Sequence, residues 1–247
     1  KPAQAMEIDV LTLFPKMFDG PLTESMMGRA QTMEHLSTRV HDIRQWAVDK
    51  HGTVDHTPYG GGGGMVLMAQ PLADGIRSVQ SGHGRGRVIY LSADGSPLSQ
   101  STANRLSLAP HLILLCGHYR GIDERIREKY VDEEVSIGDY VVTGGELPAL
   151  VLIDSVVRLI PGVLGDFQSA SDDSFQNDLL DCPWYAKPQQ FEGTDVPTEL
   201  LSGDHAAIEQ WRQEAARSRT EQRRPDLLLR QQKQTLGGSP ATTENDS

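Results

Sequence analysis

Two short and almost uninterrupted apolar runs constrain the fold most: RVIYLS at Arg87–Ser92 and HLILLCG at His111–Gly117. Runs of this kind are typical of strands that are covered on both faces in a parallel sheet. A third run, EIDVLTLF at Glu7–Phe14, is also rich in strand-forming residues. The chain therefore carries several strand candidates, two of which are expected to be buried.

Helical patterns lie between and after these strand candidates. Pro71–Val79 places apolar residues three apart, which is a helical spacing. Asp123–Tyr130 can begin on its first residue as an N-cap, and Leu147–Ile160 is followed directly by a proline. Strands that alternate with helices indicate an α/β domain.

The composition changes after Gly165, where a polar stretch of small residues is typical of a linker. A second helical block follows, in which Asp204 can cap Ala206–Arg217. Ile208, Trp211 and Ala215 share one face of that pattern, and a last helix can open at Pro225. The predicted segments are an α/β domain at 6–165, a flexible linker at 166–176, a helical domain at 177–235 and a disordered tail at 236–247.

The charge balance excludes some classes of protein. The chain has 23 Lys and Arg against 34 Asp and Glu, so its net charge of −11 argues against a basic surface for indiscriminate binding of nucleic acids. Two cysteines cannot form a disulfide framework or a four-cysteine zinc site. No apolar run is long enough to span a membrane. These features predict a reduced, soluble, cytoplasmic protein that does not bind membranes.

The run YGGGGGM at Tyr59–Met65 is the most unusual local feature. It is neither a phosphate-binding Walker loop nor a Rossmann fingerprint, because the required residues do not follow the glycines. It is either a flexible surface loop or a loop whose backbone approaches a ligand closely. His51, Asp55 and His56 precede it and match a metal site only weakly.

Two further glycine-containing motifs follow strand candidates. Leu115–Arg125, LCGHYRGIDER, lies where a parallel strand ends and a helix begins, which is where open α/β sheets bind ligands. Within it, Asp123 is alternatively a plain N-cap and Arg125 a partner of a surface carboxylate. Ser136–Ala149, SIGDYVVTGGELPA, exposes backbone groups that can bind a nucleoside, or it is an ordinary turn before a helix.

An acidic stretch and a single arginine complete the candidates. DDSFQNDLLD at Asp172–Asp181 is either a solvated charge run or a mobile loop that supplies a base to a nearby site. Arg158 falls in the otherwise apolar pattern Leu147–Ile160. The alternative for Arg158 is a helical ion pair with Asp154, four residues earlier.

Eight motifs occur together and in a fixed order. They are TLFPKMF (Thr12–Phe18), TVDHTPYGGGGGM (Thr53–Met65), IYLS (Ile89–Ser92), LCGHYRGIDER (Leu115–Arg125), SIGDYVVTGGELPAL (Ser136–Leu150), IPGVLG (Ile160–Gly165), DSFQNDLLDCPWYAKP (Asp173–Pro188) and RRPDLL (Arg223–Leu228). With them, the sequence resembles the bacterial tRNA (guanine-N1)-methyltransferase family, TrmD, of the SPOUT superfamily, over nearly its whole length.

The resemblance implies a SPOUT-type α/β fold, with a parallel sheet, helices on both faces, a C-terminal trefoil knot and a small helical domain after it. It also implies a homodimer whose active sites use both chains, and methylation of the guanosine at tRNA position 37. The implied methyl donor is S-adenosylmethionine. The residues implied to bind it are Tyr90, Leu91, Ser92, Gly117, Ile137, Gly138, Asp139, Tyr140, Val141, Val142, Gly144, Gly145 and Pro148.

The resemblance also implies a mechanism. Guanine N1 carries a proton at neutral pH, so a base must remove it, and the family base corresponds to Asp173. Arg158 corresponds to the partner arginine, which stabilises charge on guanine O6 or holds the base in place. A dependence on Mg²⁺ is not readable, and no metal ligands are assigned. The expected contacts to tRNA are Tyr59, Asp181, Arg212, Arg217, Arg219, Arg223 and Arg224.

The sequence departs from the family pattern at two positions. Gly63 stands where some relatives carry proline, which is expected to loosen the glycine loop, and Arg120 stands where many carry glutamate. Two other functions stay open as alternatives. One is a SPOUT enzyme that acts on ribosomal RNA or on a ribose hydroxyl, and the other is a catalytically silent RNA-binding protein.

Overall fold

A computed structural model describes residues 5–163 and 173–229. The chain divides into two units, Lys1–Phe167 and Gln168–Ser247, and each is described by itself. Residues 166–172 of the expected linker and the expected tail at 236–247 lie outside the described residues. In the part of the chain that the structure describes, no helix is long and apolar enough to cross a bilayer.

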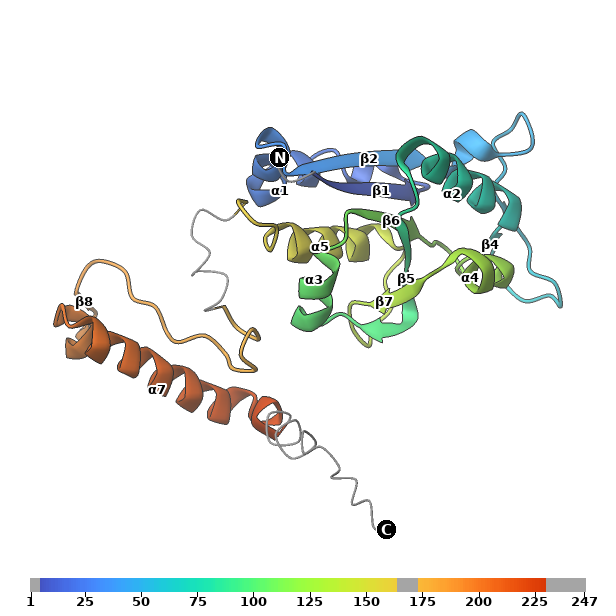
Figure 1. Cartoon of the computed structure of the whole chain (residues 1–247). Helices are drawn as coiled ribbons and strands as arrows, with labels where there is room; N and C mark the ends of the chain where they lie inside the picture. The colour runs from blue at the N-terminus through green and yellow to red at the C-terminus, as the bar shows by residue number, and fades with distance from the viewer. Residues whose placement is uncertain (1–4, 164–172, 230–247) are drawn as a thin grey trace, which may run out of the picture. The chain divides into compact units, whose positions relative to one another are not determined.

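The first unit is built on a five-stranded sheet in which every pairing is parallel (Figure 1). Its order is β2 (Leu36–Asp42), β1 (Met6–Thr12), β6 (His111–Cys116), β5 (Arg87–Pro97) and β7 (Glu133–Ser136). The central strand β6 is buried along its whole length. The apolar run at His111–Gly117 is thus the middle strand, as expected for a strand covered on both faces.

Helices cover both faces of this sheet (Figure 1). One face carries α1 (Ser25–Thr32), α3 (Gln100–Leu106) and α5 (Glu146–Val157), and the other carries α2 (Ala69–His83) and α4 (Glu124–Tyr130). Alternate residues of β6 enter the two cores, because successive strand side chains point to opposite faces. The predicted α/β class and its parallel sheet are confirmed.

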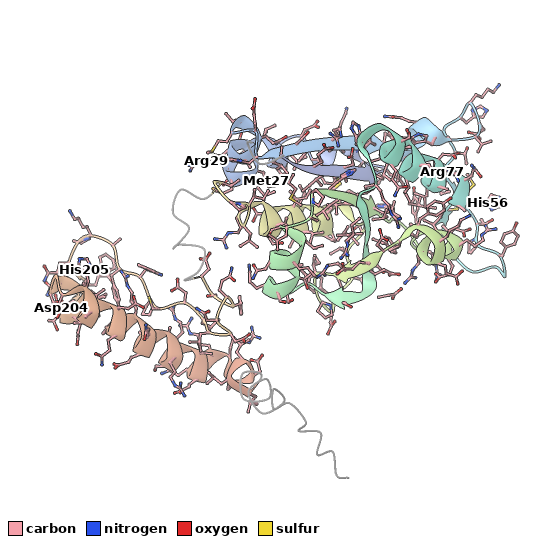
Figure 2. The ribbon with its side chains drawn as sticks, viewed as in Figure 1. Met27, Arg29, His56, Arg77, Asp204 and His205 are labelled. Atoms are coloured by element: carbon pink, nitrogen blue, oxygen red, sulfur yellow. The ribbon has the colours of Figure 1, made fainter. Side chains whose placement is uncertain are left out.

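The remaining elements of the first unit are short. Three 3-10 helices occupy Pro15–Met17, Pro21–Thr23 and Ile43–Trp46. A small antiparallel pair, β3 (Asp55–His56) and β4 (Val66–Leu67), flanks the glycine loop. In Figure 2, His56 lies at the same end of the unit as Arg77 of α2, and Met27 and Arg29 of α1 lie at the other.

Several predicted boundaries change. The helix expected at Pro71–Val79 begins two residues earlier, at Ala69. The helix expected at Leu147–Ile160 ends at Val157, because the next residues form tighter turns before Pro161. Arg158 is therefore the C-cap of α5 and does not lie inside the helix, and its backbone N–H donates to the Asp154 carbonyl.

The second unit contains the long helix α7 (His205–Arg223). Asp204 caps it as expected, accepting from the N–H groups of Ala206 and Ala207, and Figure 2 shows Asp204 and His205 at its start. The helix runs six residues beyond the predicted Arg217. A hairpin, β8 (Gln190–Phe191) with β9 (Thr194–Asp195), and a 3-10 helix at Thr198–Leu201 precede it.

The chain before the hairpin packs on α7. Thr220 is fully buried, and its hydroxyl accepts a hydrogen bond from the Leu180 N–H at 2.9 Å. Ile208, Trp211 and Ala215 are partly buried at the predicted spacing. Residues 225–229 are helical, as expected for a helix that opens at Pro225.

A buried ionic cluster lies on the α2 face of the sheet. The side chain of Asp9 in β1 has no exposed surface and accepts from both nitrogens of an Arg39 fork at 2.9 and 2.7 Å. Its oxygens also meet His41 Nε2 at 2.6 Å and His111 Nε2 at 2.8 Å. Burial alone would raise the pKa of Asp9, but these three partners hold it well below its usual range.

Candidate active site

The carboxyl ends of β5, β6 and β7 surround a cavity of about 230 Å³. All residues that the resemblance assigned to the methyl donor line this cavity, except Asp139. They come from three separate stretches of sequence that the sheet brings together. This is the edge at which open α/β sheets bind ligands.

A bulge in β5 contributes to one wall. The pairing of β5 with β7 shifts register between Leu91 and Ser96. Within the bulge, the Ser92 hydroxyl accepts from the Asp94 N–H at 3.1 Å. Ser92 and Asp94 both line the cavity. Bulges are common beside active sites, where they redirect side chains.

Close backbone contacts build the opposite wall. Gly145 N–H donates to the Gly117 carbonyl at 2.8 Å, which joins the turn before α5 to the end of β6. A Cβ atom on Gly145 would lie 2.7 Å from Cys116 Cα, and one on Gly117 would lie 2.7 Å from Tyr90 Oη. Both positions therefore require glycine for this approach.

Tyr90 forms the base of the cavity. Burial raises the pKa of Tyr90 to about 12, with the nearby Arg127 charge opposing the shift. The Arg127 guanidinium lies 5.7 Å from the centre of the Tyr90 ring and pairs with Glu134 at 2.8 Å and Asp94 at 3.1 Å. With Glu124 at 3.4 Å, three carboxylates compensate the arginine, and one of them, Asp94, remains largely exposed at the cavity.

Two polar groups near the cavity were not predicted. Glu146, in the first turn of α5, is 2% exposed and accepts from the Thr12 hydroxyl at 2.7 Å. Burial raises the pKa of the Cys116 thiol well above its usual value, and the Glu146 charge adds to the shift. His118 lines the cavity, and its buried Nδ1 has no hydrogen-bond partner among the described residues.

The glycine loop is attached next to the same cavity. Leu67 N–H donates to the Gly121 carbonyl at 3.0 Å, so β4 adjoins the turn after β6. Gly60, Gly61, Gly62 and Gly64 all have positive φ. Tyr59 at the start of the loop is fully exposed. The structure does not gather His51, Asp55 and His56 into a metal-binding group within the residues it describes.

The helix after β6 confirms that Asp123 is an N-cap and that Arg125 pairs with a surface carboxylate. Asp123 is the N-cap of α4 and accepts from the Arg125 N–H at 3.0 Å. The Arg125 side chain pairs with the same carboxylate at 2.7 Å. Neither side chain lines the cavity at the strand ends.

The second unit holds Asp173 in a groove of about 510 Å³ along α7. Asp181, Arg212 and Arg217 line the same groove, so three expected tRNA contacts lie together with the expected base. Arg219 donates to the Asp181 carbonyl at 3.2 Å. Residues 173–176, expected in the linker, pack within this unit, since the Ser174 hydroxyl accepts from the Asp181 N–H at 2.9 Å.

Within the second unit, Arg223 and Arg224 do not line this groove. Arg224 pairs with Asp226 at 2.7 Å, and Arg223 is exposed at the end of α7. Arg158 belongs to the first unit and Asp173 to the second.

The comparisons with known proteins agree on one family. A family model described as tRNA (Guanine-1)-methyltransferase TrmD matches residues 6–230. A protein of Chloroflexus aggregans, named tRNA (guanine-N(1)-)-methyltransferase, is 54% identical over 226 residues, which cover 91% of this chain and 88% of the relative. The chain belongs to the TrmD family of tRNA (guanine-1)-methyltransferases.

Other TrmD relatives are similar over the same length. The protein of Heliobacterium modesticaldum is 52% identical and covers 91% of this chain and 85% of the relative. The protein of Staphylococcus carnosus is 48% identical over 241 residues, or 98% of this chain and 95% of the relative. Both carry the name tRNA (guanine-N(1)-)-methyltransferase.

Arg120 and Gly63, the two positions expected to depart from the family pattern, contact each other. Arg120 Nε donates to the Gly63 carbonyl at 2.6 Å, and the Arg120 N–H donates to the Met65 carbonyl at 3.0 Å. Arg120 also lines the cavity at the strand ends. The glycine loop, expected to be loosened by Gly63, is thus tied at that residue to the cavity turn.

Proposed function

We propose that this TrmD-family chain methylates N1 of the guanosine at tRNA position 37 and takes the methyl group from S-adenosylmethionine. The observation that carries the proposal is the cavity at the ends of β5, β6 and β7, because it gathers the donor residues that the family resemblance assigns. The names of the relatives support the tRNA substrate. A cytoplasmic location follows from that substrate.

The chain's own groups fit this donor. Glycine-containing turns from three stretches of the chain line the cavity, which lets a nucleoside-sized ligand approach their backbone closely. The Asp94 carboxylate lines the cavity and is largely exposed, so it can face a cationic ligand, while Arg127 in the same lining is paired with carboxylates. When bound, S-adenosylmethionine supplies an electrophilic methyl group on a positively charged sulfur.

In the proposed reaction, Asp173 removes the proton from guanine N1 while the N1 lone pair forms the new bond to the methyl carbon. The proton passes to the Asp173 carboxylate, and the methyl–sulfur electrons stay on sulfur. Arg158 balances negative charge that develops on guanine O6. The target base must leave its stack to reach these groups.

We also propose a homodimer in which the segment that joins the two units of one chain closes over the cavity of the other. Leu147 and Val151 lie four residues apart on α5 and are 55% and 47% exposed, and nearby Val141 is 90% exposed. Such exposed apolar side chains are typical of a surface that another subunit covers. We further propose that the first domain contains a trefoil knot. The proposed domain limits are 6–165 and 177–235, followed by a tail at 236–247.

One experiment tests the function directly. The chain is incubated with labelled S-adenosylmethionine and tRNA transcripts that carry guanosine or adenosine at position 37. We expect label only in the guanosine transcript, as 1-methylguanosine after nuclease digestion. Label in ribosomal RNA or on a ribose hydroxyl, with none in the tRNA, would overturn the proposal.

Gly117→Ala is expected to weaken binding of S-adenosylmethionine roughly tenfold or more, because overpacking a close contact is costly. The added methyl would lie 2.7 Å from Tyr90 Oη, at the base of the cavity. Calorimetry measures the affinity. Gly82→Ala is the matched control, because a Cβ there meets nothing within 4 Å, and its donor affinity is expected to be unchanged. Equal affinities in both variants would contradict the donor assignment.

Mixed dimers test the shared site. If each site combines the cavity of one chain with Asp173 of the other, Gly117→Val and Asp173→Asn homodimers are both expected to be nearly inactive. A mixed dimer then has one site with both changes and one with neither. Random mixing is expected to restore about a quarter of the wild-type activity, since about half the dimers are mixed. No gain after subunit exchange, confirmed by mass spectrometry, would mean that each site lies within one chain.

A further inference from the structure

Trp184 in the second unit is held in place although it is largely exposed. Its side chain is 63% exposed. Its indole Nε1 donates to Asp181 Oδ2 at 2.6 Å, and the Arg212 guanidinium lies 4.7 Å from the ring centre. The edge and one face of the ring are therefore fixed before any ligand binds.

The two partners of Trp184, Asp181 and Arg212, contact its indole ring. The other oxygen of Asp181 accepts from the Cys182 N–H at 2.7 Å, which fixes the orientation of the carboxylate. Among the described residues, Arg212 makes no hydrogen bond or ion pair, and its contact is with the Trp184 ring. Its N–H groups thus remain able to donate to an anion.

Two hollows adjoin the ring. Trp184 and Arg212 line both the groove of about 510 Å³ that contains Asp173 and a second hollow of about 460 Å³. The second is also lined by Tyr185 and Trp211, whose rings lie 6.2 Å apart. An exposed, pre-oriented aromatic ring beside an arginine is the arrangement that proteins use to stack unpaired bases and contact the adjacent phosphate.

We propose that Trp184 stacks an unpaired nucleotide that flanks the target guanosine, and that Arg212 contacts the phosphate of that nucleotide. This inference rests on the proposed function, because it places the target near Asp173, which lines the same groove as Trp184. Asp181 is then a positioning residue that orients the indole.

The test compares Trp184→Ala with Trp184→Phe. Loss of one stacked base is expected to weaken binding of the tRNA transcript roughly 5- to 150-fold in Trp184→Ala. Trp184→Phe keeps an aromatic face and is expected to bind within a few-fold of the wild type. Phe191→Ala is the matched control, because Phe191 is 66% exposed in the same unit but lines neither hollow, and it is expected to have no effect.

Two further measurements separate stacking from a loss of structure. Transcripts with an abasic site at position 36 or 38 remove one flanking base at a time, and the Trp184→Ala penalty is expected to disappear on one of them. Intrinsic fluorescence is expected to be quenched when tRNA binds to the wild type, and this quenching is expected to shrink in Trp184→Phe. Affinity for S-adenosylmethionine and thermal unfolding are expected to be unchanged.

The outcomes distinguish this inference from the proposed function. If Trp184→Ala binds tRNA as tightly as the wild type, or keeps its full penalty on both abasic transcripts, the stacking platform is wrong while the methylation proposal stands. If the wild type neither binds nor methylates the tRNA transcript, the proposed function itself is wrong.

Discussion

Asp173→Asn is expected to lower the single-turnover rate of tRNA methylation by about 10²–10⁴-fold, the usual contribution of a general base. The change keeps the size of the side chain and removes its ability to accept the N1 proton. Binding of S-adenosylmethionine is expected to be unchanged, because the donor cavity is built from residues of the first unit. Rapid-quench assays at saturating tRNA measure the chemical step.

Asp178→Asn is the matched control for this variant. Asp178 lies in the same acidic stretch, and its φ of 56° is one that asparagine also adopts readily. Its single-turnover rate is expected to stay within about twofold of the wild type. A single-turnover rate for Asp173→Asn within about threefold of the wild type would show that Asp173 is not the base. Another carboxylate would then have to accept the N1 proton.

Asp9→Asn is expected to reduce the free energy of unfolding by about 1–3 kcal/mol, because it replaces a fully buried carboxylate that accepts from three partners with an amide that has only one accepting oxygen. Arg39, His41 and His111 all converge on this one carboxylate. Urea unfolding followed by circular dichroism measures the loss. Asp19→Asn, at an exposed position, is expected to change stability by no more than about 0.5 kcal/mol. A similarly small change for Asp9→Asn would show that the cluster contributes little.

The same carboxylate predicts how stability depends on pH. The pKa of Asp9 is lowered in the folded state, so its contribution is fully present above the unfolded value, near pH 4, and is lost as the pH falls below it. The wild type is therefore expected to lose stability more steeply in acid than Asp9→Asn does. Urea titrations at a series of acidic pH values compare the two slopes.

The middle of the fold could be predicted from the sequence and its edges could not. β1, β5 and β6 were predicted because their apolar runs reflect burial. β2 and β7 were missed because they are the edge strands, and LSTRVHD and EEVS carry many polar residues. Edge strands need less apolar surface, so periodicity gives little signal for them.

The candidate site shows the same division. The donor residues were assigned from ordered motifs, and the cavity gathers them as a consequence of strand order. The Thr12–Glu146 hydrogen bond was missed because it joins residues far apart in sequence. The burial of His118 Nδ1 without a partner among the described residues was missed because it depends on how the surrounding turns pack. The Arg120–Gly63 contact also joins residues far apart in sequence, and its one signal was that both positions were expected to depart from the family pattern.

The order of strands in the sheet has a consequence for synthesis on the ribosome. β6 separates β1 from β5, so a nascent chain that ends before His111 holds a β1–β2 pair and a β5 strand that cannot hydrogen-bond to it. The glycine turn that closes the cavity follows later still, at Gly145. The emerging chain consequently exposes unpaired apolar strands until most of the first unit has left the exit tunnel, a period when chaperones have their best opportunity to bind it.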